Sequence, residues 1–86
     1  MFDVLLLPNA EKTYRSTGIP LAKKLVRCFA RLERNPRQHR NIASLSGPLA
    51  GFFRYRVGDY RVIYQIDDAR QTVYVYKIAH RRDAYR

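Results

Sequence analysis

The strongest constraint on the fold is a change of hydrophobic period near the middle of the chain. Residues 19–34 repeat apolar side chains at helical spacing, with a cationic ridge of Lys and Arg on the opposite side. From residue 52 the period becomes two, and the pair Gly58-Asp59 interrupts the alternation as a two-residue turn. The sequence therefore predicts an amphipathic helix ahead of an antiparallel hairpin.

Further elements flank this pattern on both sides. The apolar run 2–7 predicts a first strand, and residues 8–15 predict a short helix. Residues 72–79 are rich in Val and Tyr and predict a last strand, whereas the polar stretch 37–51 is expected to be a loop. The expected fold class is α+β, with two N-terminal helices packed on a small antiparallel sheet of three to four strands.

Length and charge narrow the class of protein. The chain has 86 residues, which favours a single domain over residues 1–86 and excludes a doubly wound cofactor enzyme or a TIM barrel. Seventeen Lys and Arg against seven Asp and Glu give a net charge of +10. We therefore expect a polyanionic partner, with nucleic acid ahead of a membrane surface or an acidic protein.

Few residues are available for redox or metal chemistry. Cys28 has no second cysteine for an internal disulfide, and with His39 and His80 it cannot complete a structural zinc site of Cys and His alone. Cys28 also falls on the apolar side of its helix, so a nucleophilic thiol is not expected. No stretch has the pattern of a signal peptide or of a membrane span. We expect a cytoplasmic protein in a reducing compartment, with no membrane partner.

Three arginines cluster on the predicted hairpin. Arg54 and Arg56 lie on one face of its first strand, and Arg61 follows just after the turn. Like charges opposite one another destabilise a sheet, whereas a guanidinium can hold two oxygens of a phosphodiester. A solvated basic face that only keeps the protein soluble is the alternative. The aromatic residues between the arginines favour phosphate binding.

The end of the chain gathers an imidazole, three guanidiniums and a phenol within residues 80–86. This segment is either a fraying basic tail or a catalytic edge. Its place directly after the last strand favours the second interpretation, because side chains at strand ends can be aimed at a ligand. Asp83 is expected to pair with Arg81 or Arg82.

Two strings together resemble a known family. FRYRVGDYRVIY at residues 53–64 and HRRDAYR at residues 80–86 are similar to the RelE family of bacterial toxin-antitoxin toxins, and the likeness extends weakly over the whole chain. The resemblance implies a metal-independent, cofactor-free endoribonuclease (an mRNA interferase) that cleaves mRNA in the ribosomal A site and so inhibits translation. The site residues that it implies are Arg54, Arg56, Arg61, Arg81 and Tyr85.

Cleavage of RNA without a metal sets requirements that these residues can meet. The 2′-hydroxyl attacks the adjacent phosphorus, charge builds on the phosphoryl oxygens, and the 5′-oxygen leaves with a proton. Arg61 and Arg81 suit the phosphoryl charge. Tyr85, or failing it His80, is expected to handle a proton, and a phenol serves as base only where guanidiniums favour its ionised form.

Some relatives have lysine at the positions of Arg54 and Arg56. An arginine hardly gives up its proton, so here these two residues are expected to hold the substrate and to lower the pKa of a neighbouring acid. A second acid–base pair, His39 with His80, is less favoured because His39 lies in a polar loop. Asp67-Asp68 is more typical of a turn than of a magnesium site, and no metal site is expected.

The expected partners follow from the charge and from the resemblance. Residues 12–40 contain nine basic residues and one acidic residue, which favours contact with RNA or the ribosome. A cognate acidic antitoxin is expected to cover the same arginines or the C-terminal edge, an edge that can form a short helix in the free toxin. Operator DNA is expected to be bound only through the antitoxin complex. The expected RNA- or ribosome-binding residues are Lys23, Lys24, Arg27, Arg31, Arg34, Arg37, Arg40 and Arg82.

Two alternatives stay open at this point. A toxin of the ParE type, from the same superfamily, would poison DNA gyrase and would have no nuclease site. A basic nucleic-acid-binding module without catalytic activity is the other. The fold alone cannot separate the three.

Overall fold

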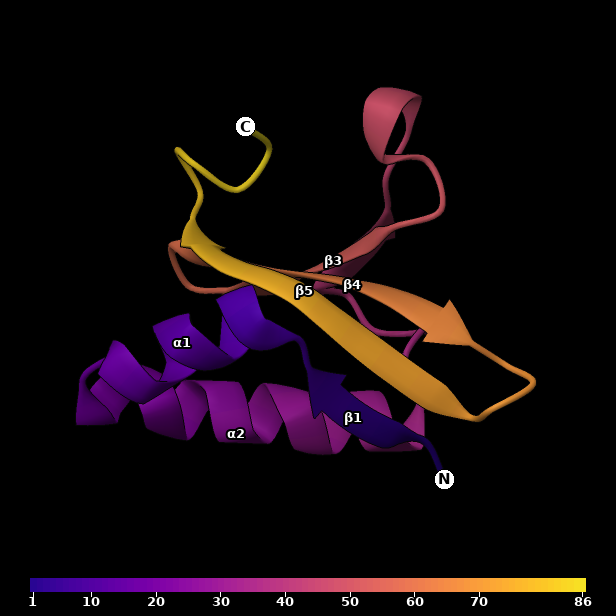
Figure 1. Ribbon diagram of the computed structural model, residues 1–86, viewed down its shortest axis with the longest axis horizontal. Coiled ribbons are helices and arrows are strands. Elements are labelled where there is room, and N and C mark those ends of the chain that lie inside the picture. The colour runs from indigo at the N-terminus through magenta and orange to yellow at the C-terminus, as the bar shows by residue number, and fades with distance from the viewer.

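The computed structural model, which describes residues 1–86, has two helices on one face of a five-stranded sheet (Figure 1). The strand order is β1-β5-β4-β3-β2, and every neighbouring pair is antiparallel except β1 and β5. The elements in chain order are β1 (Asp3–Leu6), α1 (Pro8–Ser16), α2 (Ile19–Arg34), β2 (Ile42–Ser44), the 3₁₀ turn η1 (Gly47–Leu49), β3 (Phe53–Val57), β4 (Tyr60–Asp67) and β5 (Thr72–His80).

The sheet differs from the expected one in two respects. It has five strands rather than three to four, and it is mixed because β1 runs parallel to β5. The additional strand is β2, which lies within the stretch 37–51 that was expected to be a loop. Its three residues pair with β3 in the register Ile42↔Tyr55 to Ser44↔Phe53. Three residues are too few for a period-two pattern to stand out from a polar loop.

The amphipathic helix predicted over residues 19–34 is confirmed as α2. Its apolar side buries Leu25, Cys28 and Leu32 against the sheet, and the spacing of these residues places them on one face. The sheet contributes Val62, Tyr64, Val73 and Val75 to the same core. The fold is therefore held together by one apolar layer between the helices and the sheet.

The hairpin is also confirmed. Gly58 has a φ of +57°, a left-handed conformation that glycine adopts without steric cost, and the strands that flank the turn pair as Val57↔Tyr60 and Arg56↔Arg61. Tyr55 and Val57 are buried on the helix side, so the alternating residues of β3 point to the opposite side. We call this side, which no helix covers (Figure 1), the open face.

Candidate active site

Two chain segments project from the open face of the sheet (Figure 1). One is the tail, residues 81–86, and the other is the η1 segment, residues 45–52. The η1 segment is closed at its base by a hydrogen bond from Leu45 N to Phe52 O at 2.9 Å, and the Phe52 ring contacts the Tyr76 ring of β5 at a centroid distance of 5.0 Å. Tail and η1 segment therefore stand as two walls beside the open face.

A pocket of about 360 Å³ lies between these two walls. Leu45, Pro48 and Leu49 of the η1 segment line it from one side, and Tyr85 of the tail lines it from the other. The side chain of Tyr85 is 49% exposed, although the residue before it, Ala84, is buried. The phenol is thus accessible while its backbone is held in place.

The tail is anchored by main-chain and lysine contacts. Arg81 N donates to Asp59 O at 2.7 Å in the β3–β4 turn, and the amine of Lys77 donates to Asp83 O at 2.8 Å and Arg86 O at 3.1 Å. The tail consists of turns and not of the short helix that the sequence was expected to allow. These contacts contradict a fraying tail and favour a built edge beside the open face.

Strand register places the hairpin arginines together on the open face. Arg56 lies directly across from Arg61, and Arg54 lies two residues along the same strand. The Arg61 guanidinium donates through Nη1 to Gly58 O at 3.0 Å and to Tyr60 O at 2.9 Å, and Arg54 Nη1 donates to Asn41 O at 2.6 Å. Neutral carbonyls therefore orient these guanidiniums, and no ion pair neutralises them.

Arg61 and Arg81 are both fastened to the turn Gly58-Asp59. The first is held by its guanidinium and the second by its backbone N–H. Arg81 is exposed and is free of ion pairs, because Asp83 pairs with Arg86 at 3.5 Å and not with Arg81 or Arg82 as expected. Arg61 and Arg81 thus meet at the Gly58-Asp59 turn, where the tail begins, whereas Tyr85 lies further along the tail at a pocket that no arginine lines.

His80 is not brought to this cluster. It is the register partner of Tyr60, and their rings make an edge contact at 5.6 Å. It shares its face of β5 with buried Ile78, on the helix side of the sheet. His80 Nδ1 accepts a hydrogen bond from Arg82 N at 3.2 Å, so the proton of the neutral ring lies on Nε2.

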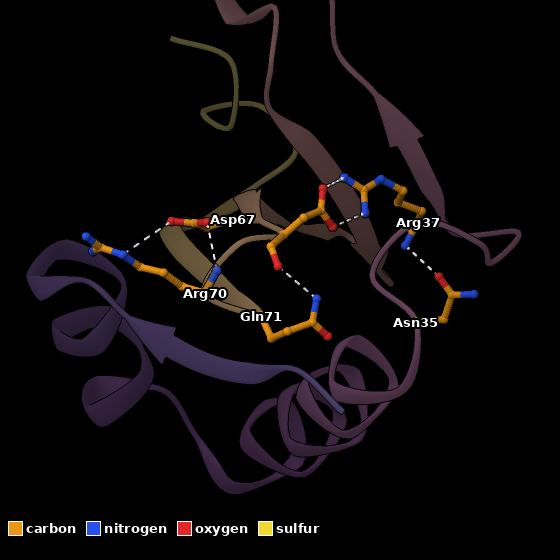
Figure 2. A network of polar contacts seen from close by, with 6 residues as sticks. Asn35, Arg37, Asp67, Arg70 and Gln71 are labelled. Atoms are coloured by element: carbon orange, nitrogen blue, oxygen red, sulfur yellow. Dashed lines mark hydrogen bonds and ion pairs between the residues drawn. The ribbon is translucent and has the colours of Figure 1, made fainter.

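His39 and the paired aspartates have structural partners. His39 stacks on Tyr55 at 5.2 Å, and its Nδ1 accepts from Asn41 N at 3.1 Å. Asp67 Oδ1 accepts from Arg70 N at 3.1 Å within the β4–β5 turn (Figure 2). No group of three or more His, Cys, Asp and Glu side chains is placed to hold a metal ion.

The expected RNA-binding residues divide into two sets. Arg37 donates through Nη1 and Nη2 to the two carboxylate oxygens of Asp68 at 2.9 and 2.8 Å (Figure 2), and these hydrogen bonds hold the pKa of Asp68 below its usual value. Arg37 therefore joins the loop after α2 to the β4–β5 turn. The others are exposed and make no ion pair: Lys23, Lys24, Arg27, Arg31, Arg34, Arg40 and Arg82.

Cys28 is not a nucleophile. It is 2% exposed in the core beneath α2, and burial raises the pKa of its thiol to about 12. The thiol is therefore protonated at neutral pH, as expected from its place on the apolar side of the helix.

Comparison with known proteins gives the family. A family model described as the ParE toxin of the type II toxin-antitoxin system, parDE, matches residues 8–85. The chain belongs to this family. It lies within the RelE/ParE superfamily, because its relatives by sequence and by structure include toxins of the RelE type.

Three relatives of this ParE-family chain come from Mycobacterium tuberculosis. Toxin RelG is 50% identical over 38 residues, which are 44% of this chain and 44% of that protein. Toxin RelE is 43% identical over 58 residues, 67% of this chain and 58% of that protein. The crystal structure of the toxin-antitoxin complex RelBE2 matches with a TM-score of 0.80 and 29% identity, covering 92% of this chain and 96% of that chain. The sequence matches thus span about half the length of the two curated relatives.

Sequence reasoning missed two parts of this toxin's open face. One is Lys77, whose signal is a lysine within the otherwise apolar and aromatic run of residues 73–79. The other is the role of the η1 segment: Gly47-Pro48 between isolated leucines predicts a pinned loop, but not that this loop lines a pocket with Tyr85. Both position Tyr85, the first by holding the tail and the second by forming the opposite wall of its pocket.

Proposed function

We propose that this ParE-family toxin is a ribosome-dependent, metal-independent mRNA endoribonuclease. The observation that carries the proposal is the placement of Arg61 and Arg81 at one turn, beside a tail that presents an accessible Tyr85. A cationic surface that is not neutralised can bind a phosphodiester, and a phenol on the tail that starts at this surface can move a proton. These residues supply charge stabilisation and one proton carrier, two of the functions that cleavage through the 2′-hydroxyl requires.

In this mechanism the arginines act on charge and position. Arg61 and Arg81 stabilise the charge that builds on the phosphoryl oxygens, and Arg54 and Arg56 hold the substrate strand on the open face. Tyr85 takes the proton of the 2′-hydroxyl or delivers one to the 5′-oxygen. His80 is the alternative proton carrier, but it lies on the other face of β5. The ribosome supplies the alignment of the A-site codon that this small open face cannot impose alone.

The proposed regulator is a cognate acidic antitoxin. The RelBE2 relative was solved as a toxin-antitoxin complex, and the open face has free arginines that an acidic segment would neutralise. Masking these charges would abolish phosphate binding without any change of fold. Operator DNA would then be reached through the antitoxin.

Primer extension on a defined mRNA in programmed ribosomes tests the nuclease. Wild type is expected to cut within the A-site codon, and Arg61→Ala and Arg81→Ala to cut about 10²–10³-fold more slowly because each removes one donor to the developing charge. Lys12→Ala on α1 is the charge control, since it removes one exposed positive charge that has no ion pair from the helix side of the sheet. Equal loss in all three variants would contradict specific roles for Arg61 and Arg81.

The same assay separates the two proton carriers. Tyr85→Phe is expected to slow cleavage about 10²–10⁴-fold, whereas His80→Ala is expected to cut near the wild-type rate. If both variants cut as fast as wild type, neither residue transfers the proton.

The match to the ParE toxin model favours a second candidate, a DNA gyrase poison. It predicts intact mRNA on ribosomes and inhibition of gyrase in a plasmid supercoiling assay with the purified chain. A gyrase poison does not need the set of Arg61, Arg81 and Tyr85. The alanine variants at the two arginines should then leave gyrase inhibition unchanged.

A further inference from the structure

A cationic pocket lies outside the open-face site, between α2 and the β3–β4 hairpin. Its volume is about 260 Å³. Lys24 and Arg27 line it from the helix, and Arg56 lines it from β3. Cys28 and Val57, both buried in the core, are part of its lining. The helix thus brings the positive charges of Lys24 and Arg27 to one concave site. Arg56 stands on the strand that forms the opposite wall, and strand alternation turns its side chain toward the open face.

The three charges have no protein partner. No acidic residue lines the pocket, and none of the four ion pairs of the structure includes Lys24, Arg27 or Arg56. Elsewhere the chain does pair exposed arginines with nearby carboxylates, as Arg37 does with Asp68. Like charges gathered in one pocket repel one another, and a bound anion relieves that repulsion.

The pocket continues into a track along α2. A neighbouring pocket of about 240 Å³ is lined by Arg27, Ala30, Arg31 and Arg34, so the two pockets share Arg27. Cations three and four residues apart follow one another at about one helical turn, or 5.4 Å. At the other end of the track, Arg56 lies directly across the hairpin from Arg61. A chain of phosphates could therefore pass from α2 to the open face without leaving positive surface.

We propose that Lys24 and Arg27, in the pocket between α2 and the β3–β4 hairpin, bind a backbone phosphate of single-stranded RNA, adjacent to the phosphate that is cleaved on the open face. The inference rests on the proposed function for the identity of the strand. It adds a second anchor point on the opposite side of the β3–β4 hairpin, which fixes the direction in which the strand leaves the site.

The lining favours RNA over an acidic peptide. Peptides that dock in grooves usually place apolar anchors beside their charges, but the apolar atoms of this pocket belong to buried core residues. The exposed apolar residues of α2, Ile19 and Val26, lie on a different side of the helix from Lys24 at 100° per residue. An RNA strand, with its regularly spaced phosphates, fits the row of cations along α2 better than an acidic peptide does.

Equilibrium binding tests the pocket independently of cleavage. The probe is a fluorescent 10-nucleotide RNA with 2′-O-methyl groups, which lacks the attacking hydroxyl and stays intact. Lys24→Gln with Arg27→Gln is compared with Lys12→Gln with Arg15→Gln, a pair on α1 that removes the same charge. All four residues are exposed, so thermal unfolding should confirm that both double variants are folded.

The pocket variant is expected to bind RNA about tenfold more weakly than wild type, because two charged contacts are lost. The magnitude of its log–log salt slope should fall by about 0.7, the value for the loss of one phosphate contact in a single strand. The α1 variant should lose less than about threefold. Failure of cleavage on ribosomes would leave this result standing, since no catalytic step enters the measurement.

Three outcomes would overturn the proposal. Equal losses in the two double variants would mean that net charge alone governs binding. A Glu-rich peptide of ten residues that shows the same pocket-specific loss would assign the pocket to an acidic protein partner. Inorganic phosphate that displaces RNA as well as unlabelled RNA does, at equal phosphate concentration, would assign it to a free ion.

Discussion

Arg61 and Arg37 show how a single partner decides what an arginine can do. Carbonyl groups hold the guanidinium of Arg61 in place and leave its charge available, whereas the carboxylate of Asp68 neutralises Arg37. A carbonyl can orient a donor without competing for an anion as a carboxylate does. The charge of Arg61 on the open face therefore stays available to an anion, whereas Arg37 joins two loops.

Tyr64 makes a buried hydrogen bond that should contribute to the stability of the fold. Its ring is fully buried, and its hydroxyl donates to Pro36 O at 2.7 Å. Tyr64→Phe removes the hydrogen bond and leaves the buried carbonyl without this donor, so the free energy of unfolding should fall by about 1–2 kcal/mol. Urea unfolding with an unchanged m-value measures the loss.

Tyr76→Phe is the control for Tyr64→Phe. Tyr76 is 38% exposed, and its hydroxyl makes no hydrogen bond within the chain, so its removal should leave the unfolding midpoint nearly unchanged. Equal destabilisation by the two variants would show that the hydrogen bond from Tyr64 to Pro36 O does not add to the free energy of unfolding.

Among the elements, β5 decides the shape of the open face. Val73 and Val75 are buried in the core, and strict alternation would place Lys77 beside them. The register with β4 shifts between Ile63 and Tyr64, so Tyr64 pairs with Val75 while Ile63 pairs with Lys77. One residue is thereby inserted into β5 as a bulge. The bulge moves Lys77 to the open face and returns Ile78 to the core.

The variant Lys77→Met tests whether the lysine that the bulge places on the open face holds the tail. The variant loses the donors to Asp83 O and Arg86 O, so the tail should open more often, and amide hydrogen exchange at Asp83 and Arg86 should speed up by about tenfold. Ribosome-dependent cleavage should fall with it, because Tyr85 loses its fixed position. Lys12→Met on α1 is the charge-matched control and should change neither quantity.

One result would show that Lys77 does not hold the tail. If exchange in the tail is unchanged in Lys77→Met, the tail is held by Arg81 and Ala84 alone, and Lys77 does not position Tyr85.

For the molecule as a whole, the net charge of +10 and its distribution favour a polyanionic partner. The cationic side of α2 and the open face both present positive side chains that make no ion pair, and Arg56 lies where these two surfaces meet. Neither α1 nor α2 could span a lipid bilayer. An extended polyanion can contact both surfaces at once.

Salt dependence measures this property at the scale of the whole chain. With about six to eight phosphates contacted, the affinity for single-stranded RNA should fall with salt at a log–log slope of about −4 to −6. Anisotropy titrations at several salt concentrations give the slope directly. A slope near zero would mean that counterion release is not the source of binding and that the cationic ridge is only a solvated surface.

The sequence alone was enough to determine α2, the β3–β4 turn and the pairing of Arg56 with Arg61. Each depends on a helical period or on a two-residue turn with glycine, and these signals lie within a few neighbouring residues. The buried state of Cys28 followed in the same way. Tertiary structure alone decided that β1 lies parallel to β5, that β2 exists, and that His80 faces the helices while Lys77 faces the tail. These features depend on which distant strands share a core and on one bulge in their register, and a single-residue shift in register exchanges the two faces of a strand.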